Sequence, residues 1–452
     1  MMNSWATETL GTLCDNHGGA IQTGPFGSQL HQHDYVPEGT PVIMPKDIKH
    51  GKIELREIAR IDDDNVKRLS KHKVKVGDII IPRRGEISKC TLITGSEVGY
   101  VCGTGCLKIT PPTAVLDATY FRYYLSRSDV IEWLENNAIG ATMLNLSGAI
   151  LKRLPVSLPC LLEQQKIAAI LSTYDDLIEN NLERIKLLEE IAQITYEEWF
   201  VRMKFPGHEE VEIDSETGLP DYWEEQDLSQ YISIKHGFAY KGEFFSEGET
   251  NRVLLTPGNF KIGGGIKLDK VKYYDEDAES PEGYVLNQHD LLVTMTDLSK
   301  MADTLGFPLL VPSSKTKKFL HNQRLGKVLP VGDSSFPKYF YYMLFQDERY
   351  RAFVVGSATG ATVKHSSPSK ILAYKPQLPP LDGELIFKFN DVTKPIFETI
   401  DLLMKESELL REARDILLPR LMTGMIDIEK VELPEALLDR INKENNNEIN
   451  ID

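Results

Sequence analysis

The hydrophobic pattern predicts a first long helix over residues 163–200. Apolar residues recur there every seven positions, on two stripes set four positions apart. A seam of this kind is typical of a coiled coil rather than of a helix with one face on a globular core. Asn181 lies on the seam and is a polar residue of the type that fixes register. The predicted pairing residues are Ile167, Leu171, Tyr174, Ile178, Asn181, Ile185 and Leu188.

A second helical stretch of similar length covers residues 389–422. Its predicted pairing residues are Ile396, Ile400, Leu403, Leu410 and Leu417. Proline cannot donate the helical hydrogen bond, so Pro395 is expected to mark the start of the helix or a kink. Two seams of similar length in one chain most simply pair with each other. The alternative is that each helix packs on its own globular domain.

The remaining sequence is strand-rich and duplicated. Short β-branched runs such as residues 76–81 are bounded by Gly and Pro, which is typical of strands. A pattern near residues 120–159 returns about 220 positions later. Residues 120–125 (YFRYYL) match 339–344 (YFYYML), Gly-Ala-Thr at 140–142 matches 360–362, and Leu-Pro at 158–159 matches 378–379. Four ordered matches, counting the helix after each Leu-Pro, indicate two similar domains.

These patterns predict an α+β protein. We expect two tandem mixed α/β domains joined by two long antiparallel coiled-coil helices, as a pseudo-twofold internal repeat. The expected boundaries are 1–160 for the first domain, 161–203 for a central helix, 204–384 for the second domain and 385–428 for a C-terminal helix. Residues 429–452 are expected to form an acidic, disordered tail.

The net charge of −16 initially argues against nucleic-acid binding, but its distribution changes that reading. Residues 208–227 contain nine acidic residues and no Lys or Arg, and residues 429–452 contain seven acidic and three basic residues. These two segments account for −9 and −4, so the rest of the chain sums to −3. Contact with a phosphate backbone depends on local patches, so a DNA-binding role stays open.

Motifs of catalytic chemistry are missing from the sequence. It has no Walker-type phosphate loop, no dinucleotide fingerprint and no Pro-Pro-Tyr motif of amino-methyltransferases. Cys102 and Cys106 lack a second pair of zinc ligands, and His31 and His33 lack a metalloprotease context, so no metal site is predicted. We therefore expect a non-catalytic chain that binds no cofactor. With no apolar run of membrane-spanning length and no secretory signal, we expect it in the cytoplasm.

Basic residues gather at corresponding places in the two predicted domains. Lys and Arg hold phosphates, while Arg, Asn and Gln can read base edges, so these clusters are candidate DNA contacts. A solvated surface face is the alternative reading. The second cluster also contains His321, Asn322 and Gln323. The candidates are Lys46, Lys49, Lys52, Arg68, Lys71, Lys73, Arg83, Arg84, Lys89 and Thr142 in the first domain, and Lys315, Lys317, Lys318, Arg324, Lys327, Thr362 and Lys364 in the second.

Together these motifs resemble the specificity subunit of type I restriction-modification enzymes. Residues 21–30 (IQTGPFGSQL) and 39–43 (GTPVI) look like the opening of a target recognition domain of that family. The run 77–80 (GDII) with Arg83 and Gly85 is similar to its central strand and loop. Gly-Ala-Thr at 140–142, Leu-Pro at 154–155 and 158–159, and Glu163, Gln164 and Ile167 resemble the boundary with the spacer helix.

The resemblance implies a division of labour. Each domain would read one half of a bipartite double-stranded DNA target, and the two helices would set the gap and dock two modification (methyltransferase) subunits. Restriction (motor-nuclease) subunits would join for cleavage. S-adenosylmethionine, ATP and magnesium are implied for those partners and not for this chain. The second domain departs from the pattern: residues 381–385 (LDGEL) replace the expected Glu-Gln, and its opening motif is matched loosely by Asn259-Phe260.

Other functions remain open from the residues alone. The chain could be the specificity module of another multi-subunit DNA methylation system, or a coiled-coil adaptor without a DNA role. A self-contained DNA methyltransferase is disfavoured by the missing motifs.

Overall fold

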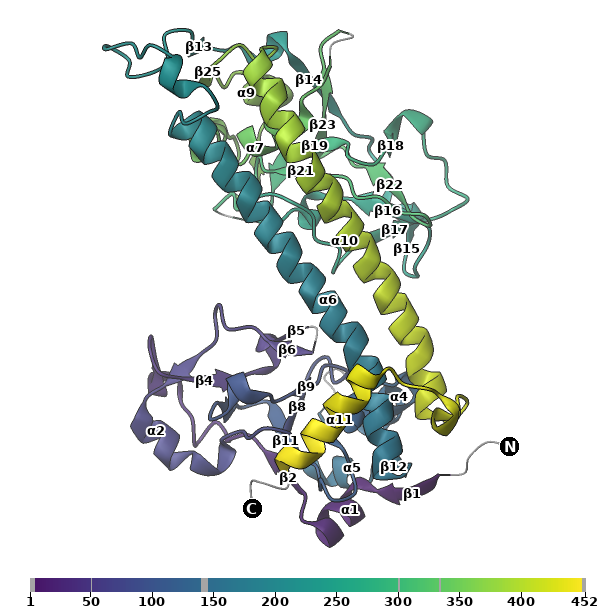
Figure 1. Ribbon diagram of the computed structural model, residues 1–452. Helices are drawn as coiled ribbons and strands as arrows, with labels where there is room; N and C mark the ends of the chain where they lie inside the picture. Colours follow the sequence, from purple (N-terminus) through teal and green to yellow (C-terminus); the bar gives the residue numbers. More distant parts are fainter. Residues whose placement is uncertain (1–4, 50, 140–144, 300, 333–334, 449–452) are drawn as a thin grey trace. The chain divides into compact units, whose positions relative to one another are not determined.

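The structure is a computed structural model that describes residues 5–49, 51–139, 145–299, 301–332 and 335–448. The chain forms two compact units, each described here by itself (Figure 1). Unit 1 contains Met1–Ile178 and Leu410–Asp452, and unit 2 contains Glu179–Leu409. The long helices α6 (Leu161–Tyr196) and α10 (Glu384–Met422) each belong partly to both units.

Unit 1 is built on two four-stranded sheets. The central sheet has the order β2-β11-β8-β9, and its strand β8 is buried along its whole length because three consecutive isoleucines face apolar neighbours on both sides. The second sheet has the order β10-β4-β7-β3, with β10 parallel to β4. The strands are β2 (Ala20–Thr23), β3 (Tyr35–Val36), β4 (Thr40–Ile43), β7 (Arg60–Ile61), β8 (Ile79–Pro82), β9 (Thr91–Leu92), β10 (Val101–Cys102) and β11 (Cys106–Thr110).

Short helices and small strand pairs complete unit 1. Helix α3 (Ala118–Leu125) begins where the Asp117 side chain accepts a hydrogen bond from the Tyr120 amide at 2.7 Å. Its aromatic residues are buried against α6 and the central sheet. The other elements are α1 (Leu10–His17), α2 (Asp63–Arg68), α4 (Ser128–Asn137), α5 (Gly148–Lys152), the pair β1 (Ala6–Thr9) with β12 (Pro155–Leu158), and the pair β5 (Ile48–Lys49) with β6 (Lys52–Ile53).

Unit 2 repeats this plan strand by strand. Its central sheet has the order β14-β23-β19-β21, and its second sheet has the order β15-β17-β16-β22-β18, with β22 parallel to β16. The strands are β14 (Ile232–His236), β15 (Phe245–Ser246), β16 (Arg252–Leu255), β17 (Lys272–Tyr274), β18 (Val285–Leu286), β19 (Leu291–Thr294), β21 (Pro308–Leu310), β22 (Lys318–His321) and β23 (Leu325–Pro330). The counterpart of β18 in unit 1 is a single antiparallel bridge between Lys73 and Val101 of β10.

The smaller elements of unit 2 also have counterparts. Helices α7 (Lys338–Leu344), α8 (Glu348–Ser357) and α9 (Pro368–Leu372) follow the order of α3, α4 and α5. Serine caps the third helix in both units: Ser147 begins α5 and Ser367 begins α9, each accepting from a backbone amide at 3.3 Å. The remaining pairs are β13 (Glu224–Glu225) with β25 (Gln377–Leu378), and β20 (Thr296–Asp297) with β24 (Lys364–His365). The predicted duplication and α+β fold are therefore confirmed.

The long helices run antiparallel to each other within unit 2. Asn181 Nδ2 on α6 donates to Glu406 Oε2 on α10 at 3.0 Å, whereas the Trp199 ring, further along α6, meets Phe389, nearer the start of α10, at 5.6 Å between centroids. Asn181 is buried and paired, as suits a polar seam residue. The predicted antiparallel helix pair is thus present in the fold.

The predicted pairing residues differ in how deeply they are buried. Ile167, Leu171, Ile178, Asn181, Ile185, Ile400 and Leu403 are buried, while Tyr174, Leu188, Ile396, Leu410 and Leu417 are half-buried. The helices also pack on their globular units: Ile167 and Leu171 belong to the core of unit 1, and Phe389 to the core of unit 2. Pairing and packing on the unit, posed above as alternatives, therefore occur together.

A polar cluster ties the two long helices to α3 in unit 1. The Asp175 carboxylate accepts hydrogen bonds from Arg122 Nη1 at 3.0 Å, Tyr123 Oη at 2.6 Å and Arg414 Nη1 at 2.5 Å. Burial, the largest single influence, raises the pKa of Asp175, but these donors outweigh it and hold the pKa below its ordinary value. The carboxylate therefore stays charged and links three helices.

The C-terminal part differs from the sequence-based expectations at two places. Pro395 does not start the helix, because α10 begins at Glu384 and continues through Pro395 to Met422, and the alternative expectation of a kink stays a prediction. The tail was expected to be disordered, yet Glu435–Glu448 forms helix α11. Ile441 of α11 is buried and Arg440 Nη1 pairs with Asp176 Oδ2 on α6 at 2.6 Å, so an apolar anchor and an ion pair hold this acidic segment on unit 1.

Candidate nucleic-acid interface

In each unit, four segments meet at one edge of the central sheet. We call these sets the first and second turn edges. The first consists of 24–26, Arg83, Arg84, 103–105 and Asn145. The second consists of Gly237, Phe238, 295–297, 322–324 and His365.

Backbone hydrogen bonds assemble the first turn edge. The Arg83 amide, just past the end of β8, donates to the Gly105 carbonyl at 2.7 Å, and the Leu146 amide donates to the Arg83 carbonyl at 2.8 Å. Arg84 forms an antiparallel bridge with Asn145. These bonds hold the C-terminal end of β8 beside the turn between β10 and β11.

The same bonds recur in the second turn edge. The Met295 amide donates to the Arg324 carbonyl at 2.9 Å, and the Ser366 amide donates to the Met295 carbonyl at 3.0 Å. Thr296 pairs with His365, as Arg84 bridges Asn145. Arg83 and Met295 are therefore equivalent positions, and so are Gly105 and Arg324.

A glycine closes each edge where the first strand of the central sheet ends. The amide of Gly24 donates to the Cys106 carbonyl at 3.0 Å, and that of Gly237 donates to the Leu325 carbonyl at 3.2 Å. A Cβ at Gly24 would lie 2.0 Å from the Gly103 carbonyl oxygen, and one at Gly237 would lie 2.1 Å from that of Asn322. Only glycine allows this close approach.

This equivalence corrects the sequence-based alignment of the second domain. Asn259-Phe260 does not correspond to the opening motif, because the Asn259 side chain accepts from the Thr256 amide as Asp47 accepts from Met44. The counterpart of Gly24 is Gly237, 213 positions later. Gly24 is followed by Pro25 and Gly237 by Phe238, so no shared dipeptide marks this pair of glycines in the sequence.

The structure places some predicted first-domain contacts on the turn edge. Arg84 is exposed, whereas Arg83 is half-buried and its guanidinium donates to the Leu146 carbonyl and to Asn145 Oδ1 at 3.3 and 3.4 Å. Lys46 is exposed and follows Pro45, whose ring would lie 3.3 Å from a Cβ at Gly105. Lys46 therefore borders the same turn.

The other first-domain candidates are not part of the first turn edge as defined above. Arg68 donates to the Gln29 carbonyl at 2.6 Å and pairs with Asp34 at 3.4 Å. Lys49 pairs with Glu54, and Lys89 pairs with Glu86. Lys52, Lys71 and Lys73 are exposed on neighbouring loops and short strands. Thr142 lies outside the described residues.

The second-domain candidates separate into two groups along β22. Arg324 and Lys364 lie on or beside the turn edge, and Thr362 is exposed in the loop before Lys364. Lys315, Lys317 and Lys318 lie at the other end of β22. Lys317 pairs with Glu249 at 3.4 Å and with Glu408 at 3.8 Å, and Lys327 pairs with Asp290 at 2.6 Å.

Two residues of the second cluster cannot reach a base. His321 and Asn322 are buried, and the His321 Nε2–H can donate to the Leu325 carbonyl at 2.9 Å. Burial lowers the pKa of His321 to about 4, so the ring is neutral at pH 7. The suggestion that they belong to a base-reading mixture was therefore wrong for these two positions.

An aspartate takes a structural role at the second turn edge. Asp297 is buried and accepts hydrogen bonds from the Ser299 amide at 2.6 Å and from Thr304 Oγ1 at 2.7 Å. Burial raises the pKa of Asp297, but these bonds outweigh that influence and lower it overall. The Asp297 carboxylate therefore connects Ser299 to Thr304, and the neighbouring Leu298 side chain is exposed.

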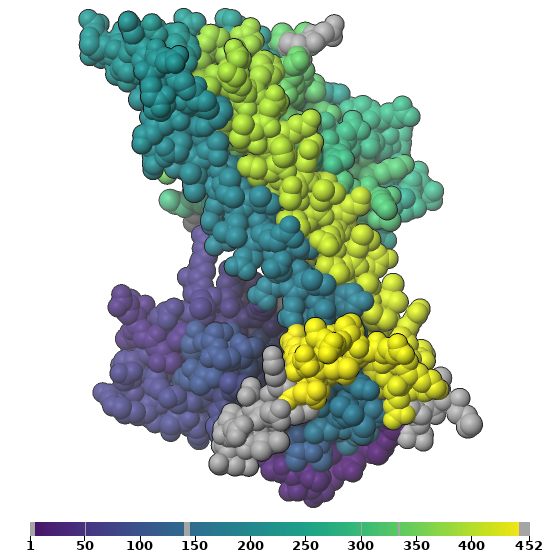
Figure 2. All heavy atoms as spheres, in the orientation of Figure 1, coloured from purple at the N-terminus to yellow at the C-terminus, as the bar shows by residue number. Residues whose placement is uncertain are grey.

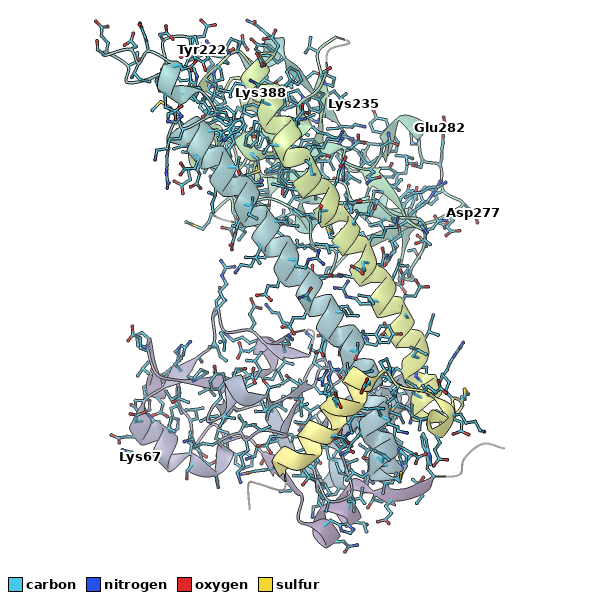
Figure 3. All side chains as sticks on the ribbon, viewed as in Figure 1. Lys67, Tyr222, Lys235, Asp277, Glu282 and Lys388 are labelled. Atoms are coloured by element: carbon cyan, nitrogen blue, oxygen red, sulfur yellow. The ribbon has the colours of Figure 1, made fainter. Side chains whose placement is uncertain are left out.

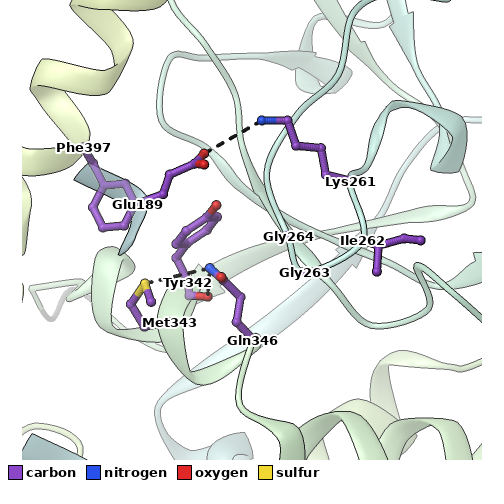
Figure 4. A pocket seen from close by; sticks show the side chains of 9 residues that line it. All are labelled: Glu189, Lys261, Ile262, Gly263, Gly264, Tyr342, Met343, Gln346 and Phe397. Atoms are coloured by element: carbon purple, nitrogen blue, oxygen red, sulfur yellow. Dashed lines mark hydrogen bonds and ion pairs between the residues drawn. The ribbon is translucent and has the colours of Figure 1, made fainter. Parts of the chain in front are cut away.

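Away from the edge, unit 2 has a small pocket between α6, α7, α10 and the loop 261–264 (Figure 4). Glu189 and Lys261 approach each other across it at 3.9 Å, and Tyr342 and Gln346 line its floor. Its volume of about 180 Å³ is below the ~300–1,000 Å³ of ordinary ligand pockets. No cluster of His, Cys, Asp and Glu suited to a metal occurs within the described ranges.

Comparison with known proteins agrees with the motifs. Residues 2–192 match the family model for the type I restriction modification DNA specificity domain. The specificity subunit of type I restriction enzyme MjaIX of Methanocaldococcus jannaschii is 26% identical over 409 residues, covering 88% of this chain and 89% of that protein. The HindI specificity subunit of Haemophilus influenzae is 23% identical over 438 residues, covering 84% and 94%.

A solved structure shares the fold. The S subunit of a type I restriction-modification system from M. genitalium superimposes with a TM-score of 0.52 at 18% identity, covering 93% of this chain and 96% of that one. The resemblance predicted from the motifs is thus confirmed: residues 2–192 match the type I restriction modification DNA specificity domain, and the chain is similar over most of its length to type I specificity subunits.

Proposed function

We propose that this chain is the DNA sequence-recognition subunit of a type I restriction-modification complex and binds a bipartite target, one half-site for each unit. The observation that carries the proposal is the repetition of the turn edge. Each unit presents an exposed arginine, Arg84 or Arg324, at an equivalent rigid edge of its central sheet. Rigid strand ends that display Arg suit base recognition in a groove.

The long helices are the proposed docking surface for two modification subunits. In unit 2, the exposed residues Leu187, Ile191 and Ile194 follow spacings of four and three, which places them on one helix face. Leu402 and Leu409 form a similar exposed row on α10. The outward surfaces of both helices are uncovered in the space-filling view of unit 2 (Figure 2). Contiguous exposed apolar rows of this kind mark interaction sites.

We propose that the chain has no catalytic site of its own. S-adenosylmethionine would bind the modification subunits, and ATP and magnesium would bind the restriction subunits. No helix in the described part of the chain has the length and apolarity of a membrane span.

A reconstitution experiment tests the proposal. Duplex DNA of random sequence is titrated with the purified chain, with a modification subunit, and with both together, at several salt concentrations. We expect tight, salt-dependent binding and methyl transfer only when both are present. Methyl transfer by this chain alone, or equal DNA binding by the modification subunit without it, contradicts the proposal. A coiled-coil adaptor would leave DNA affinity unchanged.

A further inference from the structure

The turn between β22 and β23 is held rigidly on the second turn edge. The carbonyl of Arg324 accepts from the Met295 amide at 2.9 Å, and the Gln323 amide donates to the Phe238 carbonyl at 3.0 Å. Within the turn, the Arg324 amide donates to Asn322 Oδ1 at 3.0 Å. These bonds use the backbone groups of Gln323 and Arg324 and so fix the direction in which their side chains leave the turn.

Both side chains project from this fixed turn into solvent. Gln323 and Arg324 are exposed, and no hydrogen bond or ion pair involves either side chain among the residues described. Lys317 and Lys327, from the same basic segment, already pair with carboxylates. Of these four residues, only the adjacent Gln and Arg keep all their side-chain donors available.

Comparison of the two turn edges gives this turn a distinct role. At the first edge, arginines occupy the strand end at Arg83 and Arg84, and the facing turn is Thr104-Gly105. At the second edge, the strand end carries Met295 and Thr296, which are buried, and the facing turn carries Gln323-Arg324. The guanidinium group is therefore displaced from the strand end to the neighbouring turn.

We propose that Gln323 and Arg324 are the base-reading pair of the second unit, and that the two units read DNA from different segments of the same edge. Arg324 would take the O6 and N7 acceptors of guanine, and Gln323 would pair with the N6 and N7 groups of adenine. The inference rests on the proposed function, and it specifies which half-site and which bases depend on this turn.

The charged residues near the turn are consistent with separate contacts to DNA bases and to DNA phosphates. Lys364 and His365 on β24 flank the edge through the pairing of His365 with Thr296. Lys235, on β14 (labelled in Figure 3), is committed to Tyr284, with its ammonium 4.6 Å from the ring centroid, and to the Gly283 carbonyl at 3.0 Å. A neutral amide such as Gln323 gains little from a phosphate, so its position beside Arg324 favours base edges.

The test is the methylated motif in chromosomal DNA of cells that express this chain with its modification subunit. Wild type is compared with Arg324→Ala, Arg324→Lys and Gln323→Ala. Lys375→Ala is the control, since Lys375 is an exposed cation of unit 2 that lies just before β25, pairs with Glu225 and is not a candidate DNA contact. We expect each turn variant to relax one base position of one half-site about tenfold or more, while the other half-site and the gap stay unchanged. Arg324→Lys keeps the charge but loses bidentate geometry, so it should relax the same base as Arg324→Ala.

Other outcomes overturn the inference. An unchanged motif in the turn variants, or a wild-type motif in Arg324→Lys with uniform loss in Arg324→Ala, would show that the turn supplies charge and not base recognition. Equal relaxation by Lys375→Ala would remove the special role of the turn. Absence of any motif in wild type would instead reject the proposed function, so the two failures are distinguishable.

Discussion

Arg83 and Arg84 are adjacent but have different surroundings. Arg83 is half-buried and its guanidinium holds the segment at Asn145 and Leu146, so it stabilises the first turn edge itself. Arg84 is exposed on the same edge. At the scale of single residues, Arg84 is therefore the candidate for direct recognition and Arg83 for positioning.

Replacing Arg84 with Ala should change recognition without unfolding the chain. If Arg84 reads a guanine, its loss costs about 1–3 kcal/mol at one base position of the first half-site. Competition binding with duplexes substituted at single positions measures this. Lys46→Ala, beside the same turn, should instead weaken all duplexes alike and reduce the salt slope by about one. Equal behaviour of the two variants contradicts the distinction.

His321 lies beneath the second turn edge and should make unit 2 sensitive to acid. Burial lowers its pKa in the folded chain to about 4, whereas an unfolded His titrates near 6.5. The folded state thus binds fewer protons in this window. Its contribution to stability is complete above about pH 6.5 and is lost as the pH falls toward 4. Burial also lowers the pKa values of His72 and His289, which add to the same trend.

The pH dependence can be assigned with His321→Gln, whose amide can still donate to the Leu325 carbonyl. The free energy of unfolding of wild type and variant is measured by urea titration between pH 7.5 and pH 5. The variant should lose less stability on acidification than wild type. Parallel pH profiles would show that His321 does not carry the expected linkage.

The sequence could predict where basic residues concentrate but not which of them are available. Lys317 and Arg324 look alike in a charge pattern, yet Lys317 pairs with Glu249 and Glu408 from distant segments. Such pairs depend on tertiary contacts that periodicity does not encode. The register error at Asn259 has the same origin, because only the backbone bonds of Gly237 reveal the true counterpart of Gly24.

At the scale of elements, the cluster around Asp175 links α3 to the two long helices. Asp175→Asn removes the charge and replaces one of the two acceptor oxygens with an NH2 donor, so Arg122 and Arg414, both half-buried, lose the carboxylate that they share. Hydrogen bonds to charged groups contribute about 1.5–3 kcal/mol, so Asp175→Asn should lower the free energy of unfolding by that amount.

Asp176→Asn is the matched control for this prediction. Asp176 is the next residue on α6, and its ion pair with Arg440 is largely exposed, so its removal should cost at most about 1 kcal/mol. Urea unfolding of both variants at pH 7 compares them. Equal losses would mean that the Asp175 cluster adds no more than a surface ion pair.

The heptad pattern was a sound guide to α6 and α10 because apolar spacing is a local property of the sequence. The prediction for the tail failed, because tertiary contacts decide its structure. The acidic tail forms α11, in which Ile441 is buried and Arg440 pairs with Asp176 of unit 1. Composition alone gave no signal for that anchoring.

At the scale of the whole molecule, we propose that the length of the paired helices sets the number of base pairs between the two half-sites. Inserting seven residues after Ile178 in α6 and seven after Leu409 in α10 keeps both seams in register. At 1.5 Å per residue, each helix lengthens by about 10 Å, equivalent to roughly three base pairs of DNA. The methylated motif of this variant should keep both half-sites and gain about three positions in the gap. An unchanged gap with altered half-site bases would contradict the claim that helix length sets the spacing between the half-sites.

The central claim is that two similar units each read one half of a split target. Methylome sequencing of cells that express this chain with its modification subunit, against cells that lack the chain, tests it most directly. The account predicts one methylated motif present only with the chain, made of two specified half-sites separated by unspecified positions. A single uninterrupted motif, or the same methylation with and without the chain, would contradict it.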